Sequence, residues 1–202
     1  MVMSREIDFY FDIMSPYSYF AHVKLPDLAR KYGYDLKYHP MDIPAAKLAA
    51  GNYAPKTVDV PVKFKALVED FKRWSRRYDV PFTLPGGFDA RRWNIAALFA
   101  IREARAERYV RTAYHKVWVD GVDPGDDGEL VDALSSAGLN AEAAMAYAHS
   151  VKGEAEFKKS CIDAHNRDVF GAPIMIVDDQ LYWGNDRLHF LEEYLIEASR
   201  KN

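Results

Sequence analysis

Short hydrophobic runs near both ends of the chain enclose a long stretch in which apolar residues recur at helical spacing. Residues 7–12 are aromatic and roughly alternating, which is typical of a β-strand. The apolar spacing over 17–32 predicts a helix that ends at Gly33 and is kinked or broken at Pro26. A second strand is predicted at 36–41. Because the connections are short, these elements predict a right-handed βαβ unit with parallel strands.

The middle of the chain has the apolar spacing of amphipathic helices. The predicted helices span residues 63–78, 89–106, 107–119, 129–137, 140–150 and 154–168. No internal repeat and no low-complexity linker separates them from the flanking strands. We therefore expect an all-helical insertion that packs against the sheet.

Strand patterns return near the C-terminus. Residues 173–177 are typical of a short buried strand, and a turn joins them to a hairpin partner at 180–183. The spacing over 186–199 predicts a closing helix. This order of elements is α/β and resembles a thioredoxin-like fold, βαβ…ββα, with a large helical insertion. The predicted division is a thioredoxin-like domain of residues 1–43 and 166–202 and an insertion domain of residues 44–165.

Composition narrows the classes of partner. A chain of 202 residues with net charge −3 has no electrostatic reason to bind nucleic acid or an anionic membrane. No apolar run approaches the ~20 residues that span a bilayer, and residues 1–7 do not resemble a secretory signal. The single cysteine, Cys161, excludes an internal disulfide and fits a reducing compartment. We therefore expect a cytoplasmic protein.

The segment Ser15-Pro16-Tyr17-Ser18 stands where the first strand gives way to the first helix. Thioredoxin-like oxidoreductases need Cys-x-x-Cys at this position, because the helix N-terminus lowers the thiol pKa there. The absence of cysteine excludes redox exchange by the protein at this position. Ser15 has the sequence preference of an N-cap, with Pro16 as the first helical residue. The alternative is that Ser15 and the helix N-terminus hold a thiolate that a ligand supplies.

Two further segments allow both a structural and a functional interpretation. Gly171-Ala172-Pro173 precedes the third strand, where thioredoxin-like folds have a cis-proline that faces the first helix. Proline is also common at the start of a strand without any function. Asp186 and Arg187 open the last helix. They serve either as partners of the helix dipole or as contacts for the charged ends of a peptide ligand.

Other catalytic templates are missing from the sequence. It contains no Gly-x-Gly-x-x-Gly segment, no P-loop and no Gly-x-Ser-x-Gly elbow. The six histidines show no metal-ligand spacing, so no metal is predicted.

Three segments together resemble one family: "DFYFDIMSPYSYFA", "PVKFKALVEDFKRWSRRYDVPF" and "GAPIMIVDDQLYWGNDRLHFLEEYL". They are similar to the 2-hydroxychromene-2-carboxylate isomerases and the related kappa-class glutathione transferases, which belong to the DsbA-like branch of the thioredoxin superfamily. The resemblance covers nearly the whole chain. It implies glutathione as cofactor, a homodimer, and an aromatic substrate from the degradation of aromatic compounds.

The same resemblance implies roles for particular residues. Ser15 matches the serine that hydrogen-bonds the glutathione sulfur. The other residues that match glutathione contacts are Asn52, Lys63, Ala172, Pro173, Asp186 and Arg187. The sequence departs from the family pattern around Lys63, because the spacing from Asn52 is longer and the following residues differ. The aromatic residues available for a substrate pocket are Tyr17, Tyr19, Phe88, Trp93 and Trp183.

The implied chemistry is reversible addition of the glutathione thiolate to a conjugated carbon, followed by bond rotation and elimination. Ser15 and the helix N-terminus would favour the thiolate. Two alternatives stay open. A glutathione transferase would release the conjugate, and a non-catalytic thiol- or peptide-binding protein would use the same fold.

Overall fold

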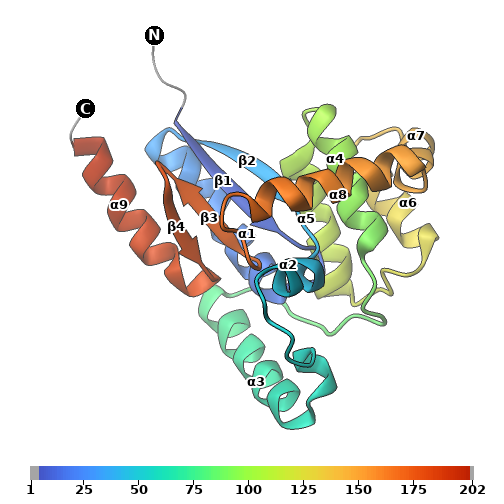
Figure 1. Cartoon of the computed structure of the whole chain (residues 1–202), viewed down its shortest axis with the longest axis horizontal. Helices are drawn as coiled ribbons and strands as arrows, with labels where there is room; N and C mark the ends of the chain where they lie inside the picture. The colour runs from blue at the N-terminus through green and yellow to red at the C-terminus, as the bar shows by residue number, and fades with distance from the viewer. Residues whose placement is uncertain (1–4, 201–202) are drawn as a thin grey trace.

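A mixed β-sheet lies at the centre of the computed structural model, which describes residues 5–200 (Figure 1). Its strands are β1 (Glu6–Phe11), β2 (Asp35–Pro40), β3 (Ile174–Val177) and β4 (Gln180–Trp183). Across the described residues the strand order is β2-β1-β3-β4, with β1 parallel to β2 and both other pairs antiparallel. The predicted parallel βαβ unit and C-terminal hairpin are confirmed.

Both faces of this sheet are covered, which explains why its central strands are apolar at nearly every position. Phe9 and Met175 point into a large core on the side of α1 (Pro16–Tyr32) and α9 (Leu188–Arg200). Tyr10 and Ile176 point into a smaller cluster on the other face. Side chains alternate in this way because successive residues of a strand face opposite sides.

The first helix starts and ends as the sequence predicts, but its interior differs. Ser15 is the N-cap, and Gly33 closes the helix with a φ of 72°. A kink or a break was predicted at Pro26; the helix continues through this residue, so it is not broken there. Pro26 is buried, and the surrounding core holds the helix together where the local sequence disfavours it.

The predicted helices of the middle region are all present with shifted ends. They are α3 (Pro61–Tyr78), α4 (Arg91–Arg102), α5 (Ala106–His115), α6 (Asp127–Ser136), α7 (Ala141–Ala148) and α8 (Val151–His165). One π-helical turn, η2 (Lys116–Asp120), extends α5. Helices α4 to α8 cluster beside the sheet, and α3 projects away from it (Figure 1). The division into two domains stays a prediction, and its outermost residues, 1–4 and 201–202, lie outside the described part of the chain.

Two short elements were not predicted, and a third takes the place of the first residues of the closing helix predicted at 186–199; all three border the site. Helix α2 (Ile43–Ala49) is capped by Asp42, whose carboxylate accepts a hydrogen bond from the Ala45 N–H. Two 3₁₀ turns, η1 (Thr57–Asp59) and η3 (Asn185–Arg187), precede α3 and α9. The two 3₁₀ turns are shorter than one helical period, and α2 contains Pro44 and three alanines, so none of the three elements shows a clear apolar stripe.

Candidate functional site

A cavity of 1090 Å³ opens at the C-terminal end of β1. Its wall includes the N-terminus of α1, the start of α2, one face of α3, the start of α4, the loop before β3 and the turn η3. These elements come from both ends of the chain and from its middle. The βαβ and ββα halves of the fold therefore meet the helical region at one place.

Ser15 lies in the wall of this cavity and is only 4% exposed. Its Oγ accepts a hydrogen bond of 3.1 Å from the N–H of Ser18, and its own proton points toward the carbonyl oxygen of Ala172 at 3.4 Å. Ser15 is thus a helix cap and a cavity residue at once. The structural and functional interpretations of this serine do not exclude each other.

The Ala172–Pro173 peptide bond is cis, and both residues line the cavity opposite the start of α1. The carbonyl oxygen of Pro173 accepts a hydrogen bond of 2.9 Å from the N–H of Gly184. Gly184 has a φ of 100°, a conformation that L side chains rarely adopt. This contact joins the loop before β3 to the turn η3.

Asp186 and Arg187 line the same cavity and form an ion pair with each other. Both side chains are about half exposed, so each can exchange its partner for a charged ligand. Asn185 lies between Gly184 and Asp186 in the sequence and is 2% exposed. The asparagine is buried, whereas its two charged neighbours are half exposed and line the cavity.

The structure brings together most of the residues that the resemblance selected. Ser15, Asn52, Ala172, Pro173, Asp186 and Arg187 all line the cavity. Lys63 does not, because it lies on the exposed first turn of α3. Two other lysines, Lys47 on α2 and Lys56 before η1, line the cavity instead. Within residues 5–200, neither forms a salt bridge.

The aromatic candidates divide in the same way. Tyr17, Phe88 and Trp183 line the cavity, and Trp183 is 56% exposed. Trp93 is fully buried in the core, where its indole N–H donates to the carbonyl of Pro124, so it is not a cavity residue. Tyr19 is also in the core, with its hydroxyl donating to Pro81. Helical spacing alone did not distinguish the cavity face from the core face.

The Tyr17 hydroxyl donates to a carboxylate oxygen of Asp70 at 2.9 Å, and the indole N–H of Trp74 donates to the same oxygen at 3.2 Å. Burial and the neighbouring Asp70 raise the pKa of Tyr17 well above its ordinary value. Tyr17 therefore stays neutral at physiological pH. It presents an aromatic face to the cavity, and its hydroxyl holds α1 against α3.

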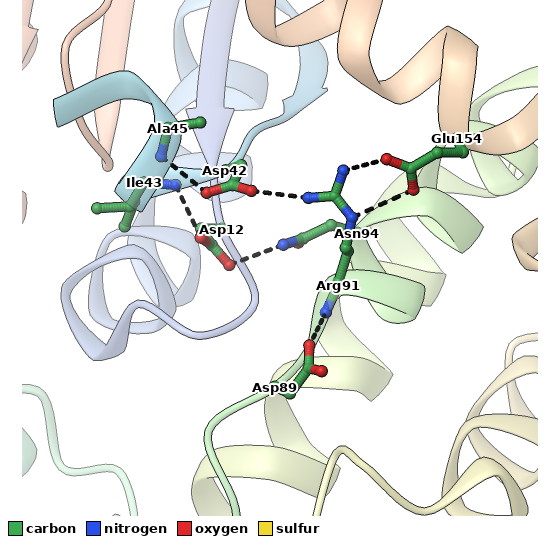
Figure 2. A network of polar contacts seen from close by, with 8 residues as sticks. All are labelled: Asp12, Asp42, Ile43, Ala45, Asp89, Arg91, Asn94 and Glu154. Atoms are coloured by element: carbon green, nitrogen blue, oxygen red, sulfur yellow. Dashed lines mark hydrogen bonds and ion pairs between the residues drawn. The ribbon is translucent and has the colours of Figure 1, made fainter. Parts of the chain in front are cut away.

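Sequence reasoning missed a polar network in the wall of the cavity, whose contacts are drawn in Figure 2. Asp12 is 5% exposed and accepts hydrogen bonds from the side chain of Asn94 and from the N–H groups of Met14 and Ile43. Burial raises the pKa of Asp12, and these three donors oppose that shift. The only signal in the sequence was an acidic residue at the end of an apolar strand, three positions before Ser15.

Arg91 occupies the outer part of this network (Figure 2). Its guanidinium donates to Asp42 at 2.7 Å and makes a two-point ion pair with Glu154 on α8. Hydrogen bonding to Glu154 raises the pKa of Arg91 further. Arg91 therefore ties α4 to α2 and α8 at the rim of the cavity.

A model of the DSBA-like thioredoxin domain matches residues 6–196. A 2-hydroxychromene-2-carboxylate isomerase of Sphingobium xenophagum is 49% identical over 195 residues, which cover 96% of this chain and 100% of the relative. The chain belongs to the 2-hydroxychromene-2-carboxylate isomerase family.

A solved structure of another isomerase of this family confirms the fold. It superposes with a TM-score of 0.93 at 34% identity and covers 98% of this chain and 97% of that chain. The family also has a more distant relative in the glutathione S-transferase kappa 1 of Caenorhabditis elegans, which is 26% identical and covers 94% of this chain and 90% of the relative. Among residues 5–200 of this chain, no helix has both the length and the hydrophobicity that crossing a bilayer requires.

Proposed function

We propose that this protein is a glutathione-dependent isomerase of the 2-hydroxychromene-2-carboxylate type, acting on a conjugated intermediate of aromatic-compound degradation. The observation that carries the proposal is the position of Ser15. It caps α1 inside a large cavity, opposite a cis-proline, in a family whose relatives are named for this isomerisation. The kappa transferase relatives are named for glutathione, which supports the choice of thiol.

The cavity fits glutathione in size and in the arrangement of its polar groups. Its volume of 1090 Å³ exceeds what a tripeptide needs and leaves room for a second small molecule. Ser15 would hold the sulfur, and the backbone of Ala172 would pair with the cysteinyl part. Asp186 and Arg187 would hold the charged γ-glutamyl end. We assign Asn52 and Lys56 to the other end, with Lys56 replacing the predicted Lys63.

Bound glutathione would supply a thiolate that adds reversibly to a conjugated carbon of the substrate and is released unchanged. Ser15 supports this chemistry because the Ser18 N–H already occupies one lone pair of Oγ. The Ser15 proton, which points toward the carbonyl oxygen of Ala172 over a long distance of 3.4 Å, would turn to the sulfur of a bound thiolate. The positive end of α1 adds to the stabilisation of a thiolate. A charge-assisted hydrogen bond of this kind contributes about 1.5–3 kcal/mol.

The exposed rings in the cavity wall would hold the flat substrate. Trp183 packs edge-on against Phe170, with ring centroids 5.0 Å apart, and Tyr17 packs against Phe71. These contacts fix the orientation of two cavity rings without help from a ligand. An aromatic substrate stacked between them would present its conjugated carbon toward Ser15.

A kappa-like glutathione transferase is the second candidate function, and the distant transferase relatives favour it. Both reactions use Ser15 in the same way. They differ in the thiol balance, because a transferase consumes one glutathione per product and an isomerase consumes none.

We also propose that the protein is a cytoplasmic homodimer that binds neither nucleic acid nor membrane. The single cysteine supports a reducing compartment. Exposed apolar side chains from the end of α2 to the first turn of α3, namely Leu48, Tyr53, Val58 and Val62, support contact with a second copy. Sedimentation equilibrium tests the dimer, and a monomer at micromolar concentration would contradict it.

The test of the function uses 2-hydroxychromene-2-carboxylate and glutathione with the wild type and Ser15→Ala. We expect isomerisation with free thiol conserved, and a loss of about 10- to 100-fold in kcat in the variant, which is the kinetic equivalent of about 1.5–3 kcal/mol. Unchanged kcat in Ser15→Ala would contradict the proposed role, and stoichiometric loss of thiol would identify a transferase.

Ser150→Ala is the matched control. Ser150 caps α8 by accepting from the Gly153 N–H and donating to the carbonyl of Tyr147, so it combines an N–H donor and a carbonyl acceptor as Ser15 does at α1. Ser150 does not line the cavity. Its variant loses the cap and should keep the activity.

A further inference from the structure

We infer that Asp12 and Asn94 form a positioning pair that fixes the loop from residue 12 to residue 15, and with it the Ser15 hydroxyl. This inference rests on the proposed function, because it assigns how Ser15 is held for that reaction. We assign neither side chain to a contact with glutathione, although both border the cavity. Their contribution is to the geometry of the loop that joins β1 to α1.

The Asp12 carboxylate accepts hydrogen bonds from three parts of the chain. One oxygen, Oδ1, accepts from the Asn94 side chain at 2.8 Å and from the Met14 N–H at 2.9 Å, and the other accepts from the Ile43 N–H at 3.2 Å. The carboxyl thus connects the loop to α4 and to the first residue of α2 (Figure 2). Three donors on one buried carboxyl define its orientation.

Asn94 completes the pair from the other side. It is 4% exposed, on the first turn of α4, and its Oδ1 accepts from the Ile13 N–H at 3.0 Å while its Nδ2 donates to Asp12. These two bonds allow only one orientation of the amide, because its oxygen must face an N–H and its nitrogen must face a carboxylate.

The pair leaves little freedom in the backbone of the loop. The N–H groups of Ile13 and Met14 bond to the pair itself, and the N–H of Ser15 donates to the carbonyl of Asp12 at 2.9 Å. The carbonyl of Ile13 accepts from the indole of Trp118 at 2.8 Å. The position of Ser15 is therefore set by contacts that reach it through the loop, and a shift at Asp12 or Asn94 would move the hydroxyl.

The test compares Asp12→Asn, Asn94→Asp and the reciprocal double variant. In Asp12→Asn, one oxygen remains for three donors, so at least one N–H loses its acceptor. In Asn94→Asp, two carboxylates face each other. In the double variant, the amide at position 12 can donate to the carboxylate at position 94, which still accepts from Ile13. Only the Met14 bond is then lost, so the double variant should be partly rescued.

We expect each single variant to lower kcat about tenfold, the equivalent of one misplaced hydrogen bond, with less than about a threefold change in the KM for glutathione. The double variant should regain part of the loss. Hydrogen exchange of the Ile13 and Met14 amides should accelerate in the single variants, without any ligand. Asp126→Asn is the matched control, because Asp126 caps α6 through the Gly128 N–H outside the cavity wall.

Folded single variants with wild-type kcat and wild-type amide exchange would overturn the inference. So would a double variant that fails to fold or to recover any activity, because Asp12 would then act alone, for example as a proton acceptor. If the single variants do not fold, the double variant alone decides. Recovery of folding and activity in it would support the inference, and no recovery would overturn it. Failure of the proposed function is distinct, because it would appear as an inactive wild type while the amide exchange effects persist.

Discussion

The Ser15 hydroxyl lies 3.4 Å from the carbonyl oxygen of Ala172, although the two residues are 157 positions apart in the chain. The contact joins the N-terminus of α1 to the loop of the cis-proline. It places the N-terminus of a helix, a hydroxyl and a backbone carbonyl around one point of the cavity. This combination of groups suits the thiolate ligand that we propose.

The first prediction concerns Ser15→Cys, which restores a thiol at the start of α1. We expect the pKa of the introduced thiol to lie below the usual value of about 8.5, because the helix N-terminus stabilises a thiolate. The rate of alkylation by iodoacetamide as a function of pH measures it. The wild type is the control, because its single thiol, Cys161, has its pKa raised by burial to about 11. An introduced thiol that titrates at or above about 8.5 would contradict the proposed thiolate site.

The second prediction separates two tryptophans that the sequence placed in one pocket. Trp183→Ala should raise the KM for the aromatic substrate about tenfold, since an aromatic contact contributes about 0.5–1.5 kcal/mol. It should change stability little, because the ring is 56% exposed. Trp93→Ala should lower the free energy of unfolding by about 3–5 kcal/mol, because it empties a fully buried site. Urea denaturation and steady-state kinetics check both.

The reverse assignment is excluded only if the two effects separate. A Trp183→Ala variant with an unchanged KM would remove the ring from the substrate site. A Trp93→Ala variant that folds normally but binds substrate poorly would return Trp93 to it.

The parts of the fold that sequence predicted correctly are those that depend on local patterns. The βαβ unit, the cap at Ser15 and the C-terminal hairpin each follow from spacing or turn chemistry within a few residues. The end of α1 at Gly33 is of the same kind. Each of these elements can be recognised from its own segment, although the strands then pair with residues farther along the chain, as Glu6 does with Asp35.

The missed features depend on partners that are distant in sequence. Asp12 and Asn94 are 82 positions apart, and Arg91 and Asp42 are 49 apart. No local pattern indicates that such side chains will meet. Lys63 lies outside the cavity wall for a related reason, because the path between α2 and α3 decides which lysine reaches the cavity. The resemblance to a family suggested the candidate residues, and the three-dimensional packing decides which of them line the cavity.

The third prediction concerns stability against acid. Asp8 on β1 accepts hydrogen bonds from His39 at 2.7 Å and from Arg167 at 2.8 Å. Burial alone would raise the pKa of Asp8, but these partners outweigh it and lower the pKa. The folded state then binds protons less readily than the unfolded state. The stabilisation is therefore present above about pH 4 and is lost as the pH falls through the lowered pKa.

Asp8→Asn should lower the free energy of unfolding by about 2 kcal/mol at neutral pH, as expected for lost hydrogen bonds to a charged group. The difference from wild type should shrink as the pH falls below about 4. Urea denaturation at a series of pH values measures it, with Asp59→Asn in the exposed turn η1 as control. A difference that stays constant down to about pH 2 would show that the charge of Asp8 is not the cause.

The fourth prediction concerns Gly184→Ala. Gly184 has φ of 100° and ψ of 153°, a region that is essentially restricted to glycine, and a Cβ there would collide with Oδ1 of Asp186. We expect a loss of about 1–3 kcal/mol in stability from the backbone alone. Because Asp186 must also move, the Kd for glutathione should rise about three- to tenfold, as measured by calorimetry.

Gly33→Ala is the control for Gly184→Ala. Gly33 has a φ of 72°, nothing lies within 4 Å of the added Cβ, and the residue is far along α1 from Ser15. It should lose stability for the same conformational reason and keep the Kd for glutathione. An equal loss of affinity in both variants would mean that destabilisation alone weakens binding. A loss confined to Gly184→Ala would place the γ-glutamyl end of the ligand against Asp186.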